Sequence, residues 1–323
     1  MKKFQKLAVI MIIAICGMSM LFAQGAAEAL KAQKDIVVLY TNDVHCGIDQ
    51  NLGYAGLATV KAQEEAKTPF VTLVDAGDAI QGDAIGTVSN GSYLVDIMNE
   101  VGYDYAIFGN HEFDYGMANL AADLAKANAK YLASNIHYNG SAAVMPSNIA
   151  PYAIEQYGYL KVAFIGVSTA ETLTKSTPKY FMENGEFVYS FDAGEALYAT
   201  VQGYVDEVKA QGADVVVVIA HLGLEEDSIP NRSVDLIANT TGIDVVIDGH
   251  SHSTVAQEFV ADKAGKKVIL TQTGTKLEAI GKLTISADGS CKTELITEAA
   301  KDEKTTAFID SIKAEYETAL NAV

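Results

Sequence analysis

Five short apolar runs, each with histidine, aspartate or asparagine within the next two residues, constrain the fold of this 323-residue chain more than any other feature. The runs cover residues 36–41, 70–74, 105–108, 215–220 and 245–247. Such runs are typical of β-strands, and the continuous ones predict strands buried on both faces. Of the six histidines, all but His137 lie in the polar clusters after these runs. Histidines gathered at strand ends, with acidic residues between them, indicate a metal site.

The clusters contain ligand types and spacings that suit metal ions. Side chains two residues apart on a strand point to the same face, so Asp43 and His45 are expected to reach one ion if the strand stays extended. The same spacing predicts a shared ion for His250 and His252. Carboxylate, carboxamide and imidazole ligands without thiolate favour Mn²⁺, Zn²⁺, Fe or Co ions. There are too many candidates for one ion; they suit two ions about 3.5–4 Å apart, with Asp78 as the bridge because a carboxylate has two oxygens.

The order of the motifs resembles that of a known family. The motifs are Thr41-Asn42-Asp43-Val44-His45, Gly77-Asp78 with Gln81-Gly82, Gly109-Asn110-His111-Glu112, His221 and Gly249-His250-Ser251-His252. Together they resemble the motifs of the calcineurin-like metallophosphoesterases, in particular the catalytic domain of bacterial secreted 5'-nucleotidases and UDP-sugar hydrolases. The resemblance runs from about residue 35 to residue 290.

The resemblance implies a role for each matching residue. One ion would be held by Asp43, His45, Asp78 and His252, and the other by Asp78, Asn110, His221 and His250. His111 would be the catalytic imidazole that faces the phosphoryl group, and Asp114 would orient it. Glu112 is expected to hold its loop rather than bind metal. The motifs identify no substrate-binding residue.

Strand-like and helix-like segments alternate along the chain, which predicts an α/β sandwich with the site at the carboxyl ends of the strands. The expected helices cover residues 54–67, 93–101, 117–129, 193–210 and 233–240. Short β-like segments at 254–260, 267–271 and 279–285 are expected to be antiparallel strands that complete the second sheet. With the resemblance, the predicted fold is the four-layer α/β/β/α metallophosphoesterase sandwich.

Three segments are predicted in sequence order. Residues 1–29 have the basic start, apolar run and small residues of a secretory signal peptide, although an uncleaved membrane anchor is the alternative. Export would place the protein in the periplasm or outside the cell. Residues 30–298 are expected to form the catalytic domain, and residues 299–323 a linker-like helix. Resembling enzymes usually continue into a nucleotide-binding domain, which is expected to be absent here, so a separate domain of that kind is a candidate partner.

The net charge of −18 excludes one class of partner. There are 41 acidic residues against 23 basic ones, and Arg232 is the only arginine, so the chain lacks the basic face that a nucleic-acid polymer requires. A small phosphate ester remains compatible, because two metal ions would dominate the local field. Beyond residues 1–29 the chain has Cys46 and Cys291, and their pairing stays open.

The function predicted from these features is a secreted phosphoesterase with two divalent metal ions. Its expected reaction is the hydrolysis of nucleoside 5'-monophosphates to nucleoside and phosphate, in nucleotide catabolism. Alternatives on the same fold are a 2',3'-cyclic-nucleotide phosphodiesterase, a UDP-sugar hydrolase and a thiosulfohydrolase. An alternative from another class is a non-catalytic periplasmic binding protein, against which the intact motifs argue.

Overall fold

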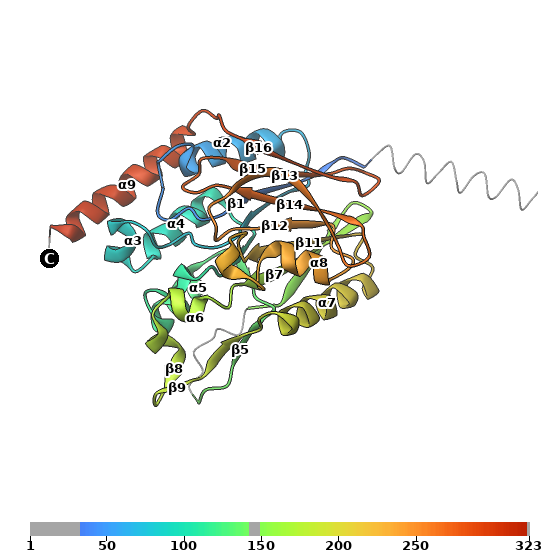
Figure 1. Ribbon diagram of the computed structural model, residues 1–323. Helices are drawn as coiled ribbons and strands as arrows, with labels where there is room; N and C mark the ends of the chain where they lie inside the picture. The colour runs from blue at the N-terminus through green and yellow to red at the C-terminus, as the bar shows by residue number, and fades with distance from the viewer. Residues whose placement is uncertain (1–32, 142–148, 322–323) are drawn as a thin grey trace, which may run out of the picture.

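Two six-stranded sheets lie face to face between layers of helices (Figure 1). The structure is a computed structural model that describes residues 33–141 and 149–321. In the first sheet the order is β16-β15-β1-β2-β3-β4, and in the second it is β13-β14-β12-β11-β7-β6. The strands of the first sheet are β1 (Ile36–Thr41), β2 (Val71–Asp75), β3 (Tyr105–Ile107), β4 (Lys130–Leu132), β15 (Ile280–Ile285) and β16 (Cys291–Ile296). Those of the second are β6 (Tyr152–Tyr157), β7 (Leu160–Ser168), β11 (Val215–His221), β12 (Val245–Ile247), β13 (Thr254–Ala261) and β14 (Lys267–Thr273).

The central strands of both sheets are parallel, and the antiparallel pairings lie toward the edges. In the first sheet β1 to β4 run parallel, β15 pairs antiparallel with β1, and the edge strand β16 pairs antiparallel with β15. In the second sheet β7, β11, β12 and β14 run parallel, with β6 and β13 antiparallel at the edges. The carboxyl ends of β1, β2 and β3 therefore lie along one edge of the first sheet, and those of β11 and β12 along one edge of the second.

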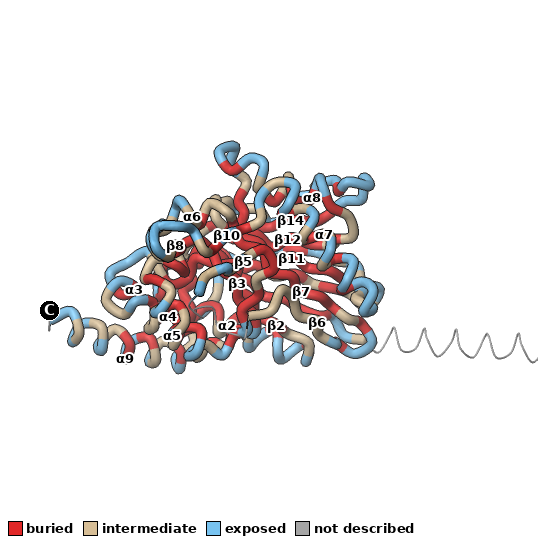
Figure 2. Tube along the Cα trace, turned by 90° about the horizontal axis from the view of Figure 1, so that it is seen from below, coloured by how far each residue is buried: buried red, intermediate tan, exposed pale blue. Residues whose placement is uncertain are grey.

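The apolar runs are continuous because the strands are buried on both faces (Figure 2). In β1, Val37 and Leu39 pack toward the helices, whereas Val38 and Tyr40 pack between the sheets against residues such as Val217. Tyr40 Oη is also hydrogen-bonded to Thr271 Oγ1 of the opposite sheet at 2.6 Å. Burial of this much apolar surface between two sheets is the main source of stability for such a fold.

Helices cover the outer face of each sheet. The first sheet is covered by α2 (Gly53–Glu65), α4 (Ser92–Val101), α5 (Met117–Lys126) and α9 (Glu303–Leu320), and the second by α7 (Glu195–Ala210) and α8 (Ser233–Asn239). Short elements lie between these layers or near the site: α3 (Ala84–Ser89), α6 (Thr172–Lys175), η1 (His111–Phe113), η2 (Pro178–Phe181) and η3 (Glu226–Ser228). Two small two-stranded sheets pair β5 (Ile136–Tyr138) with β10 (Tyr189–Phe191) and β8 (Met182–Glu183) with β9 (Glu186–Phe187). The predicted four-layer α/β/β/α sandwich is confirmed.

One part of the predicted topology is wrong. The three late β-segments were expected to complete the second sheet as antiparallel strands, but β15 pairs with β1 in the first sheet and β14 runs parallel to β12. The cause is the connection between β14 and β15. Gly274, Lys276 and Leu277 have φ values of 82°, 50° and 56°, and this left-handed turn carries the chain from one sheet to the other.

The segment predicted as a linker-like helix forms α9 and packs onto the first layer. Its Asp302 cap accepts a hydrogen bond from the Thr305 N–H, and Ile309 and Ile312 are buried. The helix contacts α2, α3 and α4 at one end of the molecule (Figure 1). The proposed signal segment, residues 1–29, lies outside the described residues. Among the residues that the structure describes, no helix has the length and apolar character needed to cross a membrane.

Asp123 in α5 gives a testable pH dependence of stability. Its side chain is buried, Oδ2 has no hydrogen-bond partner among the described residues, and burial raises the pKa to about 7. The unfolded pKa is about 3.9, so the folded state binds the proton more tightly and stability falls as the pH rises from about 4 to about 7. We expect Asp123→Asn to have a higher Tm than the parent protein, and we expect this increase in Tm to be larger at pH 8 than at pH 5. Asp310→Asn, at an exposed position, is the control for removal of a carboxylate. An equal increase in the Tm of Asp123→Asn at both pH values would contradict the raised pKa of Asp123.

Candidate metal centre

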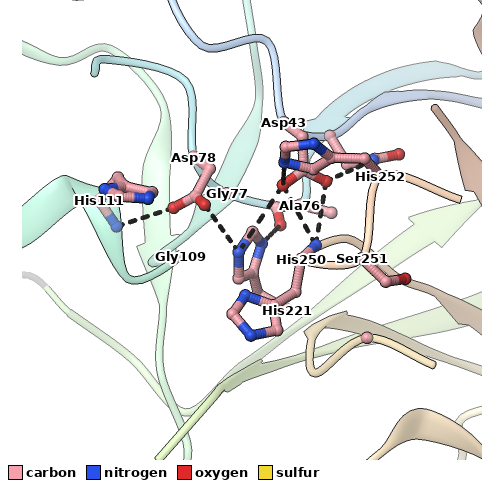
Figure 3. A network of polar contacts seen from close by, with 12 residues as sticks. Asp43, Ala76, Gly77, Asp78, Gly109, His111, His221, His250, Ser251 and His252 are labelled. Carbon is pink, nitrogen blue, oxygen red and sulfur yellow. Dashed lines mark hydrogen bonds and ion pairs between the residues drawn. The ribbon is translucent and has the colours of Figure 1, made fainter. Parts of the chain in front are cut away.

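Six of the candidate ligands form two groups where the two sheets meet (Figure 3). One group contains Asp43, His45 and His252, and the other contains Asp78, His221 and His250, with the ligand atoms of each group within 4.8 Å of one another. Each group combines residues from both sheets. Asp43, His45 and Asp78 follow β1 and β2 of the first sheet. In the second sheet, His221 ends β11, and His250 and His252 follow β12. Asp78 lies in the second group only, and Asn110 belongs to neither.

The backbone that carries these ligands is left-handed, which corrects the expectation from strand spacing. The strand β1 ends at Thr41. The φ values are 51° for Asp43, 45° for His45, 59° for Asp78, 77° for His250 and 52° for His252. Positive φ in residues other than glycine costs on the order of 1–3 kcal/mol each and is concentrated at functional sites. Consequently His250 and His252 do not share one group, because the turn between them separates side chains that an extended strand would align.

Two glycines of the motifs allow the β2 and β3 loops to touch. Gly77 has φ 91°, and a Cβ added there would lie 2.5 Å from the Gly109 N atom. A Cβ on Gly109 would collide with Asp78 Oδ1. These positions accept only glycine because the two loops and the Asp78 carboxylate approach one another too closely for a Cβ atom. This explains in physical terms why Gly77 precedes Asp78 and Gly109 precedes Asn110.

Both aspartates accept hydrogen bonds from the backbone and also face histidines. The His250 N–H donates to Asp43 Oδ2 at 3.0 Å and to Oδ1 at 3.2 Å, and Oδ1 also lies 3.3 Å from His252 Nε2. Asp78 Oδ1 accepts from the His111 N–H at 2.8 Å, while Oδ2 lies 3.1 Å from His221 Nε2 and 3.8 Å from His45 Nε2. Asp78 Oδ2 therefore faces one histidine of each group, which is the position that a bridging ligand needs.

Buried donor atoms at the centre fit a pair of cations. His221 Nε2 and Asn110 Oδ1 are buried and have no hydrogen-bond partner among the described residues. Although burial lowers it, the pKa of His221 is raised to about 10 by Asp78 and Asp43, so the local field favours positive charge. Burial and the neighbouring His221 lower the pKa of His250 to about 4, which leaves that ring neutral near pH 7. Such a donor set suits divalent metal ions.

The spacing of the imidazole nitrogens also fits metal ligation. His45 Nε2 and His252 Nε2 lie 3.0 Å apart. Metal–nitrogen bonds of about 2.0–2.1 Å that meet at roughly 90–109° place two such nitrogens about 2.8–3.4 Å apart. The protein therefore has two divalent-metal sites, of unspecified metal identity.

Two buried carboxylates hold the ligand loops. Glu112 accepts hydrogen bonds from the N–H groups of Asp78, Ala79 and Gly109 at 2.9, 2.8 and 2.7 Å. It thus holds its loop, as expected from the sequence. Asp248 accepts from the N–H groups of Leu222 and Gly223, directly after His221, at 2.9 and 3.3 Å. Sequence reasoning missed Asp248, although its place directly before Gly249-His250 was a signal.

His111 and Asp114 form a pair beside the metal ligands. His111 Nδ1 lies 2.6 Å from Asp114 Oδ2, and the His111 and His45 ring centroids are 5.4 Å apart. Burial lowers the pKa of His111, but Asp114 and Asp78 outweigh that effect and raise it above the ordinary value. Ser176 Oγ donates to Asp114 Oδ1 at 2.7 Å, a contact that no motif indicated.

Four other residues noted in the sequence, His137, Arg232, Cys46 and Cys291, lie outside the ligand groups. His137 in β5 lies 2.9 Å from Asp192, and Arg232 pairs with Asp235. Cys46 and Cys291 are both free, so the pairing that the sequence left open does not occur.

Glu171 is a further residue that sequence reasoning missed. It precedes α6, and its Oε2 lies 3.0 Å from His250 Nε2 and 2.8 Å from Lys175 Nζ. The only available signal was the polar stretch 168–171 after the apolar run of β7.

Comparisons with known proteins agree with this geometry. A family model described as bacterial capsule synthesis protein PGA_cap matches residues 65–272. The chain is 33% identical over 234 residues to a snake venom 5'-nucleotidase from Crotalus adamanteus, and 33% identical over 235 residues to a 5'-nucleotidase from Bos taurus. The solved structure of a 5'-nucleotidase precursor from Thermus thermophilus aligns with a TM-score of 0.74 and 24% identity, over 90% of this chain and 59% of that one. The two curated matches each cover 68% of this chain, but the chain spans only 37% and 38% of those relatives' lengths.

Proposed function

Because this chain belongs to the calcineurin-like phosphoesterases of the 5'-nucleotidase family, as its PGA_cap match and its relatives show, we propose that it hydrolyses nucleoside 5'-monophosphates to nucleoside and phosphate. The observation that carries the proposal is the pair of ligand groups with Asp78 Oδ2 between their histidines and His111 alongside. The His111–Asp114 pair beside the ligand groups favours catalysis over a non-catalytic binding protein, which would need no positioned imidazole of this kind.

The two ligand groups, with Asp78 Oδ2 facing a histidine of each and the buried Asn110 Oδ1 without a partner among the described residues, support the following roles. Asp43, His45, Asp78 and His252 would hold one ion, and Asp78, Asn110, His221 and His250 the other. Bound there, divalent ions neutralise negative charge that develops on a phosphoryl group. The chain's own residues fix this arrangement, because backbone N–H groups orient Asp43 and Asp78, and Glu112 and Asp248 hold the loops.

His111 would act on the substrate directly. With Nδ1 bonded to Asp114, the other ring nitrogen is left to donate a hydrogen bond to a phosphoryl oxygen or a proton to the leaving group. Ser176 holds Asp114, and Asp114 in turn keeps the imidazole in one orientation and favours its protonated form.

We also propose that residues 1–29 direct export to the periplasm or the cell exterior. The basic start at Lys2 and Lys3 and the apolar run 7–15 support this. The relatives extend beyond the matched region, so a nucleotide-binding domain outside residues 33–321 is proposed as the source of base selectivity. In keeping with this, Arg232, the one arginine, is engaged by Asp235 and not by the metal ligands.

Phosphate release by the purified chain with Mn²⁺ tests the function. We expect AMP, GMP and p-nitrophenyl phosphate to be hydrolysed with kcat/KM values within about tenfold of one another, a difference under roughly 1.4 kcal/mol in activation free energy. The reason is that the parts of the substrate remote from the phosphorus atom contribute little binding energy to this chain. The bis(p-nitrophenyl) ester and UDP-glucose distinguish the diesterase and pyrophosphatase activities, and a His111→Ala preparation controls for contaminants. Absence of phosphate release from every monoester would overturn the proposed function. A thousandfold preference for one nucleotide would place base recognition within this chain.

A further inference from the structure

Three candidate metal-binding histidines each have one ring nitrogen bonded to an oxygen. His45 Nδ1 lies 2.8 Å from the Gln81 carbonyl oxygen, and His221 Nδ1 lies 2.7 Å from that of Ala76. A carbonyl oxygen can only accept, so Nδ1 of both rings carries the hydrogen and Nε2 is left for a metal. In His250 the order is reversed, because its Nε2 lies 3.0 Å from Glu171 Oε2.

A carboxylate likewise can only accept, so the contact with Glu171 requires the hydrogen of His250 on Nε2. The nitrogen with a free lone pair is then Nδ1. The second neighbour of Nε2 is Lys175 Nζ at 3.2 Å, an obligatory donor that would require the opposite form of the ring. Lys175 Nζ also lies closer to Glu171 Oε2, at 2.8 Å, so its hydrogens are directed to the carboxylate.

The position of Glu171 is fixed by the second sheet. The Glu171 N–H donates to Thr169 Oγ1 at 3.2 Å, directly after β7. The last residue of β7, Ser168, is paired in register with His221, another candidate ligand. The side chains of Glu171 and His250 are 17% and 6% exposed, so little water competes for the bond between them.

We propose that Glu171 is a positioning residue that fixes His250 in its Nε2–H form and presents Nδ1 to the metal ion held with Asp78 and His221. The inference rests on the proposed role of His250 as a ligand. Glu171 does for His250 what the carbonyl groups of Gln81 and Ala76 do for His45 and His221. Partners of this kind are worth about 10–100-fold in metal affinity.

The first test reads the ring directly in metal-free, ¹⁵N-histidine-labelled full-length protein. Long-range ¹H–¹⁵N spectra distinguish the two neutral forms, and a His250→Gln spectrum identifies the His250 signals. We expect the Nε2–H form in the parent protein and in Glu171→Gln, whose amide oxygen still accepts. In Glu171→Met, whose side chain has a similar length but no hydrogen-bond acceptor, His250 should lose the Nε2–H form. Lys175→Met and the exposed Glu226→Ala should retain it. An unchanged ring in Glu171→Met, or a change in Lys175→Met instead, would overturn the inference.

The second test measures Mn²⁺ binding by isothermal titration in the same variants. Glu171→Met should weaken one of the two Mn²⁺ sites by about 10–100-fold and leave the other unchanged. Glu171→Gln should restore most of the lost affinity. Equal weakening of both sites, or none, contradicts the inference. If Glu171→Met does not fold, shown by loss of the remaining histidine signals, Glu171→Ala provides the second variant without an acceptor. Neither measurement depends on catalysis, so a failed phosphatase assay would reject the proposed function while leaving this result standing.

Discussion

Removal of bound divalent metal is expected to reduce phosphate release to the uncatalysed rate, and Mn²⁺ or Co²⁺ is expected to restore it. The centre gathers two carboxylates, a carboxamide and four imidazoles, and Asp43 and Asp78 are buried with no lysine or arginine paired to them among the described residues. Without cations, the same carboxylates would repel the dianionic phosphate of the substrate. The measurement is dialysis against a chelator, followed by metal titration with activity and bound metal determined together.

Asp78→Asn should lower both metal content and rate, because Oδ2 faces a histidine of each ligand group. Asp49→Asn, at an exposed aspartate that pairs with Lys313, is the matched control and should change neither quantity. Full activity with one tightly bound equivalent of metal would show that the dinuclear assignment is wrong.

His111→Ala should depress kcat by about 10²–10⁴-fold while both metal ions stay bound. That range is typical when a positioned imidazole transfers a proton or stabilises charge in the transition state. The side chain of His111 bonds to Asp114 and belongs to neither ligand group, although its backbone N–H bonds to Asp78 Oδ1. Alanine retains that N–H, so the orientation of Asp78 should survive. Metal analysis and steady-state kinetics on the same preparation check this.

His137→Ala provides the matched control for His111. It also removes an imidazole paired with an aspartate, at 2.9 Å from Asp192, but in β5 and outside the ligand groups. Its kcat should stay within about twofold of the parent value, as expected for surface substitutions. If His111→Ala lost metal to the same extent as Asp78→Asn, the assignment of His111 as a catalytic residue would be wrong.

The positions of the site residues along the chain could be predicted because burial on two faces leaves a readable pattern. All residues of β1 are buried, so the strand is a nearly continuous apolar run, and the polar ligands begin where the strand ends. Parallel pairing then brings Asp43, Asp78 and Asn110 to one edge. The helices α2, α4 and α8 could also be predicted, because each has one buried face that leaves a pattern of apolar residues.

The local geometry of the site could not be predicted, because residue spacing contains no backbone dihedral. Asp43 and His45 meet through left-handed turns, not through an extended strand. Glu171 and Ser176 were missed because their partners lie 79 and 62 residues away in the sequence and neither residue belongs to a cluster that contains a histidine. After β14 the chain passes from the second sheet to the first through a short turn, so that β15 pairs with β1. The direction in which this turn leads the chain could not be predicted from its sequence.

The division of each ligand group between the two sheets has a consequence for the lifetime of the fold. An ion held by Asp43 and His252, or by Asp78 and His250, connects the sandwich halves as a removable cross-link. Free metal at 100 times its Kd adds about 2.7 kcal/mol per site to the free energy of unfolding, provided the unfolded chain does not bind it. That is a large share of the roughly 5–15 kcal/mol typical of a domain. We therefore expect the supply of metal where the chain folds to change its resistance to proteases, even in the absence of substrate.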